Sequence, residues 1–380
     1  MRSELRYDVV LARFGEIGLK SRPVRRRFEQ TLQDNIERAF EQEGLDGIVT
    51  RVPGRLLVSS SDLARAQGIL SRIFGLTSVS LARIVPSELP LLLGEIPKFF
   101  DELAATRPGA KTFALRVRRS GQHPYTSQDV ARQGGGTVLD RPGGDRWRVN
   151  LTQPDIEVFI EIRDRQAFLF HGRLDAPGGL PMGTQGRVVV LLKDLHSLIA
   201  AWLMMKRGCT ILPITYTGIT GQPERARSLL EFLRRWNFKG ELVELPHEEA
   251  REFPKEAACV LCMRQMIRKA GLYARRKKAK AIVTGEAFTS TTVESLTQFG
   301  AIADVPILRP VLGMTPSLVA EFAQRIGVEA GRTTRFHEPC PMRTPGRVED
   351  STVHRLEAEL GVEVRAFEAV RTKKTASVTA

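Results

Sequence analysis

Apolar and polar positions along the first half of the chain follow two different periods. Apolar residues recur every four positions at Phe28, Leu32, Ile36 and Phe40, the spacing of an amphipathic helix. Helices are expected at 28–42, 63–73, 91–103 and 127–138. Alternating or short apolar runs predict strands at 7–14, 55–59, 112–117, 146–151, 158–162 and 167–171. Helices interspersed with short strands indicate an α+β arrangement.

The pattern changes after residues 176–187, a segment rich in glycine and proline that is typical of a linker. The run 188–192 is apolar throughout, as expected for a strand buried on both faces. Further strands are expected at 211–216, 241–245 and 281–284, and helices at 198–207, 225–237 and 263–278. This alternation predicts an α/β domain with a mainly parallel sheet, whose ligand site lies at the carboxyl ends of the strands.

Composition excludes several classes of protein. Hydrophobic residues make up 42% of the 380 residues and charged residues 26%, as in a globular protein. The chain shows neither an apolar run of membrane-spanning length nor a secretory segment at its start, so we expect a cytoplasmic protein without a membrane partner. Two of the four cysteines form a C-x-x-C pair, which favours metal or redox chemistry over a disulfide framework.

The net charge of the chain indicates the chemical class of its binding partner. The chain carries 57 Lys+Arg against 43 Asp+Glu, a net charge of +14, and such a field attracts polyanions. The basic residues cluster near the start, after the strand at 112–117 and along 264–280; solvated helix faces are the alternative interpretation. Aromatic residues make up only 7%, which favours backbone recognition of a folded RNA over base stacking. The RNA-contact candidates are Lys20, Arg22, Arg25, Arg26, Arg116, Arg118 and Arg119.

The connection after the strand 188–192 reads Lys193-Asp194-Leu195-His196-Ser197 and contains no glycine. A nucleotide site at this turn would use glycines, because they let backbone N–H groups approach a phosphate closely. Lys193 and His196 offer charge but no cradle of amides, so a plain strand–helix connector is the favoured interpretation. We expect Ser197 to cap a helix that starts at Leu198, and Gly208 to end it.

Five segments together resemble one family, the tRNA 4-thiouridine synthetases. They are ARFGEIGLKS, RVRRSGQHPYTS, GGLPMGTQG, SLIAAWLMMKRG and CVLCMRQMIRKA, in the family's order, and the resemblance runs from about residue 7 to about residue 347. It implies a ferredoxin-like domain at 1–75, a THUMP domain at 76–175, a linker at 176–187 and a PP-loop pyrophosphatase-like domain at 188–371. The remaining residues, 372–380, are expected to be a disordered tail.

The resemblance also implies an activity and its partners. In this family the first two domains hold the tRNA acceptor region, and the PP-loop domain uses ATP to adenylate uridine 8. Sulfur then displaces AMP; it comes from a persulfide or from sulfide bound to an iron–sulfur cluster. A sulfur donor is thus a second expected partner, and family members often form homodimers.

Three departures from the family pattern place ATP binding in doubt. The family loop S-G-G-x-D-S keeps only Ser197 here. After Thr284-Gly285-Glu286 the family's S-L-G-Q-V-A-S-Q is replaced by 287–294, and after Arg309-Pro310 an Asp-Lys pair is replaced near Thr315-Pro316. The candidates for nucleotide contacts are Lys193, His196, Ser197, Gly285, Glu286 and Arg309.

The cysteines indicate a second type of site. In family members that lack a rhodanese domain, cysteines placed like Cys259, Cys262 and Cys340 hold an iron–sulfur cluster. Three thiolates suit a cluster with one open iron, or a zinc with His337 as fourth ligand. Cys340 is the catalytic candidate, Arg264 is expected to lower the thiol pKa values, and Cys209 belongs to the core.

Three interpretations of the function remain open from the sequence. The first is an active tRNA sulfurtransferase with an unusual loop. The second is a tRNA-binding paralogue that has lost ATP chemistry. The third is an iron–sulfur protein that relays sulfur or senses redox state.

Overall fold

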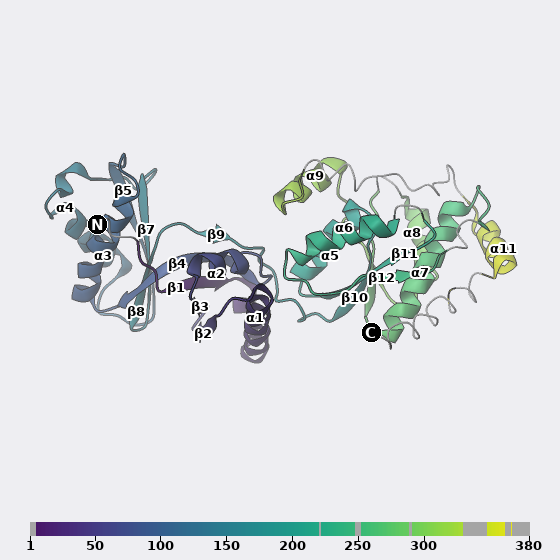
Figure 1. The fold of residues 1–380 in the computed structure, drawn as a ribbon, viewed down its shortest axis with the longest axis horizontal. Helices are drawn as coiled ribbons and strands as arrows, with labels where there is room; N and C mark the ends of the chain where they lie inside the picture. The colour runs from purple at the N-terminus through teal and green to yellow at the C-terminus, as the bar shows by residue number, and fades with distance from the viewer. Residues whose placement is uncertain are drawn as a thin grey trace. The chain divides into compact units, whose positions relative to one another are not determined.

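The computed structural model describes residues 5–219, 222–247, 252–288, 291–329, 348–361 and 366. The chain forms two compact units, Met1–Gly179 and Leu180–Ala380 (Figure 1). Cys340, His337 and the expected tail 372–380 lie outside the described residues. No helix within the described part of the chain is long and apolar enough to cross a membrane.

A nine-stranded mixed sheet forms the centre of the first unit. Its order is β2-β3-β1-β4-β8-β7-β5-β6, and β9 pairs with β4. The strands are β1 (Val9–Phe14), β2 (Ile48–Val52), β3 (Arg55–Ser59), β4 (Leu76–Pro86), β5 (Thr112–Ser120), β6 (Arg148–Val149), β7 (Ile156–Arg163), β8 (Gln166–Phe170) and β9 (Leu174–Asp175). The α+β prediction for this half is confirmed.

Amphipathic helices pack on this sheet as their apolar spacing predicts. All four apolar residues that predicted the first helix, from Phe28 to Phe40, are buried, and the helix ends at Gly44, whose φ of 59° suits a residue without a side chain. The helices are η1 (Glu16–Leu19), α1 (Arg22–Glu43), α2 (Leu63–Leu70), α3 (Leu89–Ala105), α4 (Ser127–Leu139) and η2 (Gly144–Arg146).

The apolar pattern does not predict strand β4, yet this strand joins the two halves of the first unit. It pairs with β1 over its first part and with β8 over its second part, both antiparallel. Because its neighbours change along its length, its buried positions do not alternate regularly. The period-2 signal of a strand is therefore weak here.

The second unit has the predicted parallel sheet, in the order β12-β11-β10-β13-β14. Its strands are β10 (Arg187–Leu191), β11 (Thr210–Tyr216), β12 (Val243–Leu245), β13 (Ala281–Val283) and β14 (Ile307–Leu308). The helices described are α5 (Leu195–Lys206), α6 (Gln222–Arg234), α7 (Ala258–Arg276), α8 (Val293–Gly300), α9 (Pro316–Arg325) and α11 (Asp350–Leu360).

Helices cover both faces of this sheet. Helices α5 and α6 pack on one face of the strands, and α9 packs against α5. Helix α7 packs on β10 and β13, and α8 and α11 pack against α7 (Figure 1). The chain leaves β10 toward β11 on one side and returns to β13 on the other. The strand order therefore reverses at β10, and a ligand site of this fold is expected at the carboxyl ends of β10 and β13.

Candidate functional site

The loop between β10 and α5 is folded onto itself. The backbone N–H groups of Lys193 and Asp194 each donate to Ser197 Oγ at 2.9 Å, and the Ser197 N–H donates to Asp194 Oδ1 at 2.8 Å. Asp194 and Ser197 thereby form a reciprocal capping box, and the helix starts at Leu195. The expectation that Ser197 caps a helix from Leu198 is therefore wrong, because Asp194 is the N-cap and Ser197 already lies in the first turn of the helix.

This arrangement does not fit the pyrophosphate cradle that the fold family implies. Three loop amides already have partners within the loop, and Asp194 places a carboxylate at the helix N-terminus, where an anion would bind. Lys193 and His196 are half-buried at the same turn. Gly285 lies directly against it, because a Cβ there would come within 3.0 Å of backbone atoms of His196 and Ser197.

We expect Gly285→Ala to destabilise the second unit by about 1–3 kcal/mol, because the added methyl group would push α5 away from the end of β13. Urea unfolding measures the change. Gly300→Ala at the end of α8 is the matched control, since no atom lies within 4 Å of the added Cβ. Equal stability of the two variants would contradict the packing described.

Glu286 and Arg309 form a buried ion pair at the carboxyl ends of β13 and β14. Glu286 is 6% exposed; its Oε2 accepts from Arg309 Nε at 2.6 Å and from Thr284 Oγ1 at 2.8 Å. Glu286 and Arg309, two of the candidates for nucleotide contacts, are therefore ion-pair partners of each other. The structure brings both to the same end of the sheet as Ser197 and Gly285, as predicted from the motifs.

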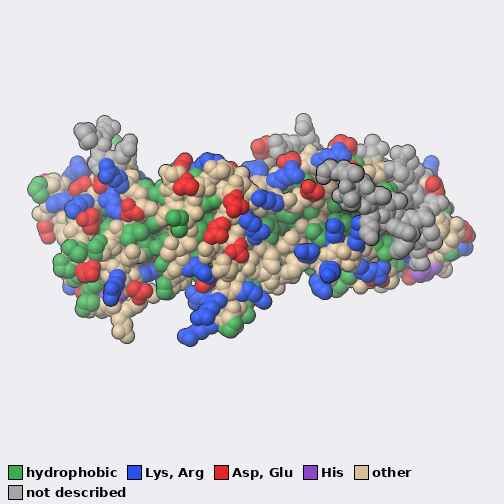
Figure 2. All heavy atoms as spheres, turned by 60° about the horizontal axis from the view of Figure 1, so that its bottom comes forward, with side chains coloured by type: hydrophobic (Ala, Val, Ile, Leu, Met, Phe, Trp, Pro, Cys, Tyr) green, Lys and Arg blue, Asp and Glu red, His purple; other side chains and the backbone are tan. Residues whose placement is uncertain are grey.

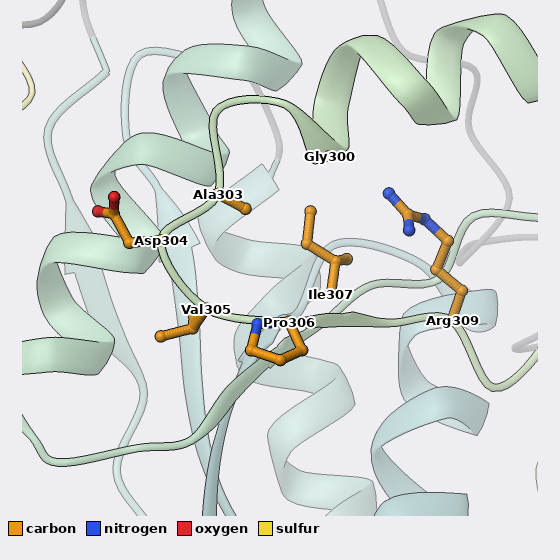
Figure 3. Close-up of a pocket in the computed structure, with 7 residues that line it drawn as sticks. All are labelled: Gly300, Ala303, Asp304, Val305, Pro306, Ile307 and Arg309. Carbon is orange, nitrogen blue, oxygen red and sulfur yellow. The ribbon is translucent and has the colours of Figure 1, made fainter.

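A pocket of about 350 Å³ lies beside Arg309. Figure 3 shows the guanidinium of Arg309 and the carboxylate of Asp304 at opposite sides of it, with Ile307 between them. It is lined by Gly300, Ala303, Asp304, Val305, Pro306, Ile307 and Arg309. The described residues that line it include none of the loop 193–197, so this pocket is separate from the self-capped turn.

Both cysteines of the C-x-x-C pair lie in the first turns of α7, which begins earlier than the helix expected at 263–278. Cys259 is half-buried, whereas Cys262 is 3% exposed and its Sγ lies 3.2 Å from His247 Nε2. His247 belongs to no sequence motif, and no local pattern indicates that it lies beside Cys262. Among the described residues, no group of three or more metal-binding side chains occurs; Cys340 is outside them. The two cysteines are one turn apart on one side of α7, which fits two donors of a shared group.

The basic run along α7 does not form one exposed surface. Arg264 is 2% exposed and donates to Glu357 Oε1 at 2.7 Å, and Arg268 donates to both oxygens of the same carboxylate. Lys269 is fully buried. The charge of Arg264 is thus paired with a carboxylate on α11, and its expected effect on the thiol pKa values stays a prediction.

The RNA-contact candidates come together on the first unit only in part. Lys20, Arg22, Arg26, Arg118 and Arg119 are exposed, whereas Arg25 pairs with Glu29 and Arg116 with Glu157. Gly54, at the β2–β3 turn, lies near Arg25 on α1 and Arg163 on β7: a Cβ there would be 4.0 Å from Arg25 and 3.7 Å from Arg163. Figure 2 shows basic side chains gathered at the lower edge of this unit.

A buried ion cluster, also missed by the sequence analysis, lies beside this basic surface. Glu161 on β7 is 4% exposed and pairs with Arg13, Arg55 and Arg163. Although burial disfavours its ionisation, these arginines hold the pKa of Glu161 below its usual value. Burial lowers the pKa of Arg13 to about 10. The cluster links β1 and β3 to β7, that is, the two halves of the first unit.

Comparison with known families identifies the parts of the chain. A family described as thiamine biosynthesis protein (ThiI) matches residues 183–356, the THUMP domain matches 95–171, and the ThiI ferredoxin-like domain matches 9–80. The fold therefore comprises ferredoxin-like and THUMP domains followed by a PP-loop-type domain. The boundaries 1–75, 76–175 and 188–371 stay predictions.

Solved structures with this fold include PH1313 from Pyrococcus horikoshii, at 27% identity and a TM-score of 0.70, covering 84% of this chain and 99% of that one. Another is a 4-thiouridine synthetase–RNA complex with bound ATP, at 25% identity and a TM-score of 0.80, covering 96% and 98%.

Curated relatives cover almost the whole chain. A probable tRNA sulfurtransferase of Methanobrevibacter smithii is 33% identical, over 85% of this chain and 87% of its own. One of Methanosarcina acetivorans is 31% identical, over 97% and 93%. With this identity over this length, and with the ThiI, THUMP and ferredoxin-like domains in order, the chain belongs to the tRNA sulfurtransferase family.

Proposed function

We propose that this protein binds tRNA through its first unit and serves the family reaction, thiolation of uridine 8. The observation that carries the proposal is the basic surface of that unit, on which Lys20, Arg22, Arg26, Arg118 and Arg119 are exposed. A structural relative solved with RNA and ATP shares the fold over 96% of this chain. The protein acts in the cytoplasm, where tRNA and sulfur donors meet.

Removing two phosphate contacts tests the RNA-binding half. We expect the double variant Arg118→Ala, Arg119→Ala to bind tRNA more weakly and to lower the slope of log K against log salt by about 1 per lost contact. Fluorescence anisotropy at several salt concentrations measures both quantities. Arg132→Ala is the control, because Arg132 is exposed on α4 and pairs with Asp129. Unchanged affinity and slope in the double variant would refute this surface.

A second candidate function is a tRNA-binding paralogue without ATP chemistry. The self-capped start of α5 favours it, since the loop amides and the Asp194 carboxylate leave no cradle for a pyrophosphate. Thermal unfolding with and without ATP distinguishes the active enzyme from the paralogue, because a ligand that binds the native state raises the stability of that state. A shift with ATP, and 4-thiouridine at position 8 after anaerobic incubation with ATP, sulfide and unmodified tRNA, would support the active enzyme. Intact tRNA binding with neither result would support the paralogue.

We further propose that Cys259, Cys262 and Cys340 hold an iron–sulfur cluster or a zinc ion, with Cys340 as the catalytic cysteine. The one-turn spacing of the first two on α7 supports a shared group. A cluster would supply sulfide at an open iron; without ATP chemistry it would relay sulfur or sense redox state instead. Iron, sulfide and zinc analysis after anaerobic purification tests this, with Cys259→Ala as the comparison. A homodimer is proposed as well, which light scattering checks.

A further inference from the structure

Behind Cys262 the core of the second unit contains a small group of buried polar side chains. His247, just after β12, and Lys269, on α7, are both fully buried, and Cys262 is 3% exposed. They lie among apolar side chains that include Tyr216 on β11 and Phe253. Burying an amine in such surroundings is costly unless it is hydrogen-bonded. An apolar residue at position 269 would fill the same space without this desolvation cost, which indicates that the amine of Lys269 has a specific role.

Hydrogen bonds join the three residues in a fixed order. Lys269 Nζ donates to the Pro246 carbonyl oxygen at 2.6 Å and lies 3.3 Å from His247 Nδ1. On the other side of the ring, His247 Nε2 lies 3.2 Å from Cys262 Sγ. Cys262 and Lys269 are seven residues apart, two turns along one face of α7, so the imidazole bridges them.

The order of the bonds sets their direction. A lysine ammonium has three N–H donors and no acceptor, so the Nδ1 atom that faces it must present its lone pair. The neutral imidazole then carries its proton on Nε2, and this N–H points at the sulfur of Cys262. The sulfur of Cys262 is then the acceptor of this hydrogen bond.

We propose that His247 and Lys269 are positioning residues for Cys262, with Lys269 fixing the imidazole tautomer and His247 donating an N–H···S hydrogen bond. The pair holds the Cys262 sulfur in a fixed position on α7. It does not activate the sulfur for attack, because a histidine that serves as base must accept the thiol proton. The hydrogen bonds are formed by the chain itself, so the relay is independent of the proposed cluster and of ATP.

Nitrogen-15 NMR of the histidine ring tests the tautomer directly in the full chain without added metal. The sequence has six histidines, and His247→Gln identifies the signals of His247. We expect the Nε2–H tautomer in the wild-type protein and a mixture of tautomers in Lys269→Met. Lys280→Met is the control, since Lys280 is exposed. An Nδ1–H tautomer in the wild-type protein, or no change in Lys269→Met, would overturn the relay. Thermal unfolding establishes that each variant is folded.

The reduction potential of an anaerobically reconstituted cluster gives a second readout, because hydrogen bonds to ligand sulfurs raise it. We expect His247→Phe to shift the potential to a more negative value and His247→Gln, which keeps an N–H donor, to restore much of it. Equal potentials in the wild-type and His247→Phe proteins would count against the N–H···S bond. A wild-type chain that assembles no cluster refutes the cofactor proposal, and the NMR measurement then decides the relay.

Discussion

Glu161→Ala is expected to destabilise the first unit by about 3–5 kcal/mol, because it removes the carboxylate that neutralises three arginines. Arg13 is 6% exposed and cannot reach bulk water without unfolding its surroundings. Loss of these ion pairs weakens the link between β7 and the strands β1 and β3, so we expect tRNA affinity to fall as well.

Glu157→Ala is the matched control for Glu161→Ala. Glu157 lies four residues earlier on β7 and pairs with Arg116 at 2.6 Å, but both side chains are more than one third exposed. Such a pair contributes about 1 kcal/mol or less. Trp147 is the tryptophan of the first unit, so urea unfolding followed by its fluorescence, in a chain with Trp202 and Trp236 replaced by phenylalanine, isolates this unit. Equal losses in the two variants would contradict the role given to the cluster.

Glu357→Gln is expected to weaken the attachment of α11 to α7 by about 3 kcal/mol at neutral pH. Burial disfavours the charged form of Glu357, but hydrogen bonds from Arg264 and Arg268 outweigh burial and lower its pKa to about 2 from the ordinary value of 4.5. This carboxylate is 7% exposed and its arginine partners are 3% and 11% exposed, so solvent screens the interaction little.

The lowered pKa of Glu357 predicts how the free energy of unfolding of the second unit depends on pH. Because the folded pKa is below the unfolded one, the stabilisation is complete above about pH 4.5 and is lost as pH falls from there to about 2. A difference of this size corresponds to about 3 kcal/mol. In Glu357→Gln that part of the acid dependence should vanish, and urea unfolding between pH 2 and 6 measures it. An unchanged pH profile would refute the lowered pKa.

At the candidate site, the sequence predicted which residues lie together, but only the structure showed how the loop between them is folded. Motif positions predicted that Ser197, Gly285, Glu286 and Arg309 meet at one end of the sheet, and they do. The self-capping of the loop was not predictable, since it depends on the Asp194 carboxylate taking the Ser197 N–H group. Competition between two local hydrogen-bond partners is decided by backbone geometry.

The sequence by itself determined the domain classes, the parallel sheet of the second unit, the basic helix that follows the C-x-x-C pair, and the family. These follow from local periodicity and from motifs of adjacent residues. Only the tertiary structure decided that Arg264 and Lys269 are buried, that Glu161 joins two halves of a sheet, and that His247 meets Cys262. Each of these contacts joins residues on different elements, and a side chain's charge and type do not reveal which distant partner will neutralise it.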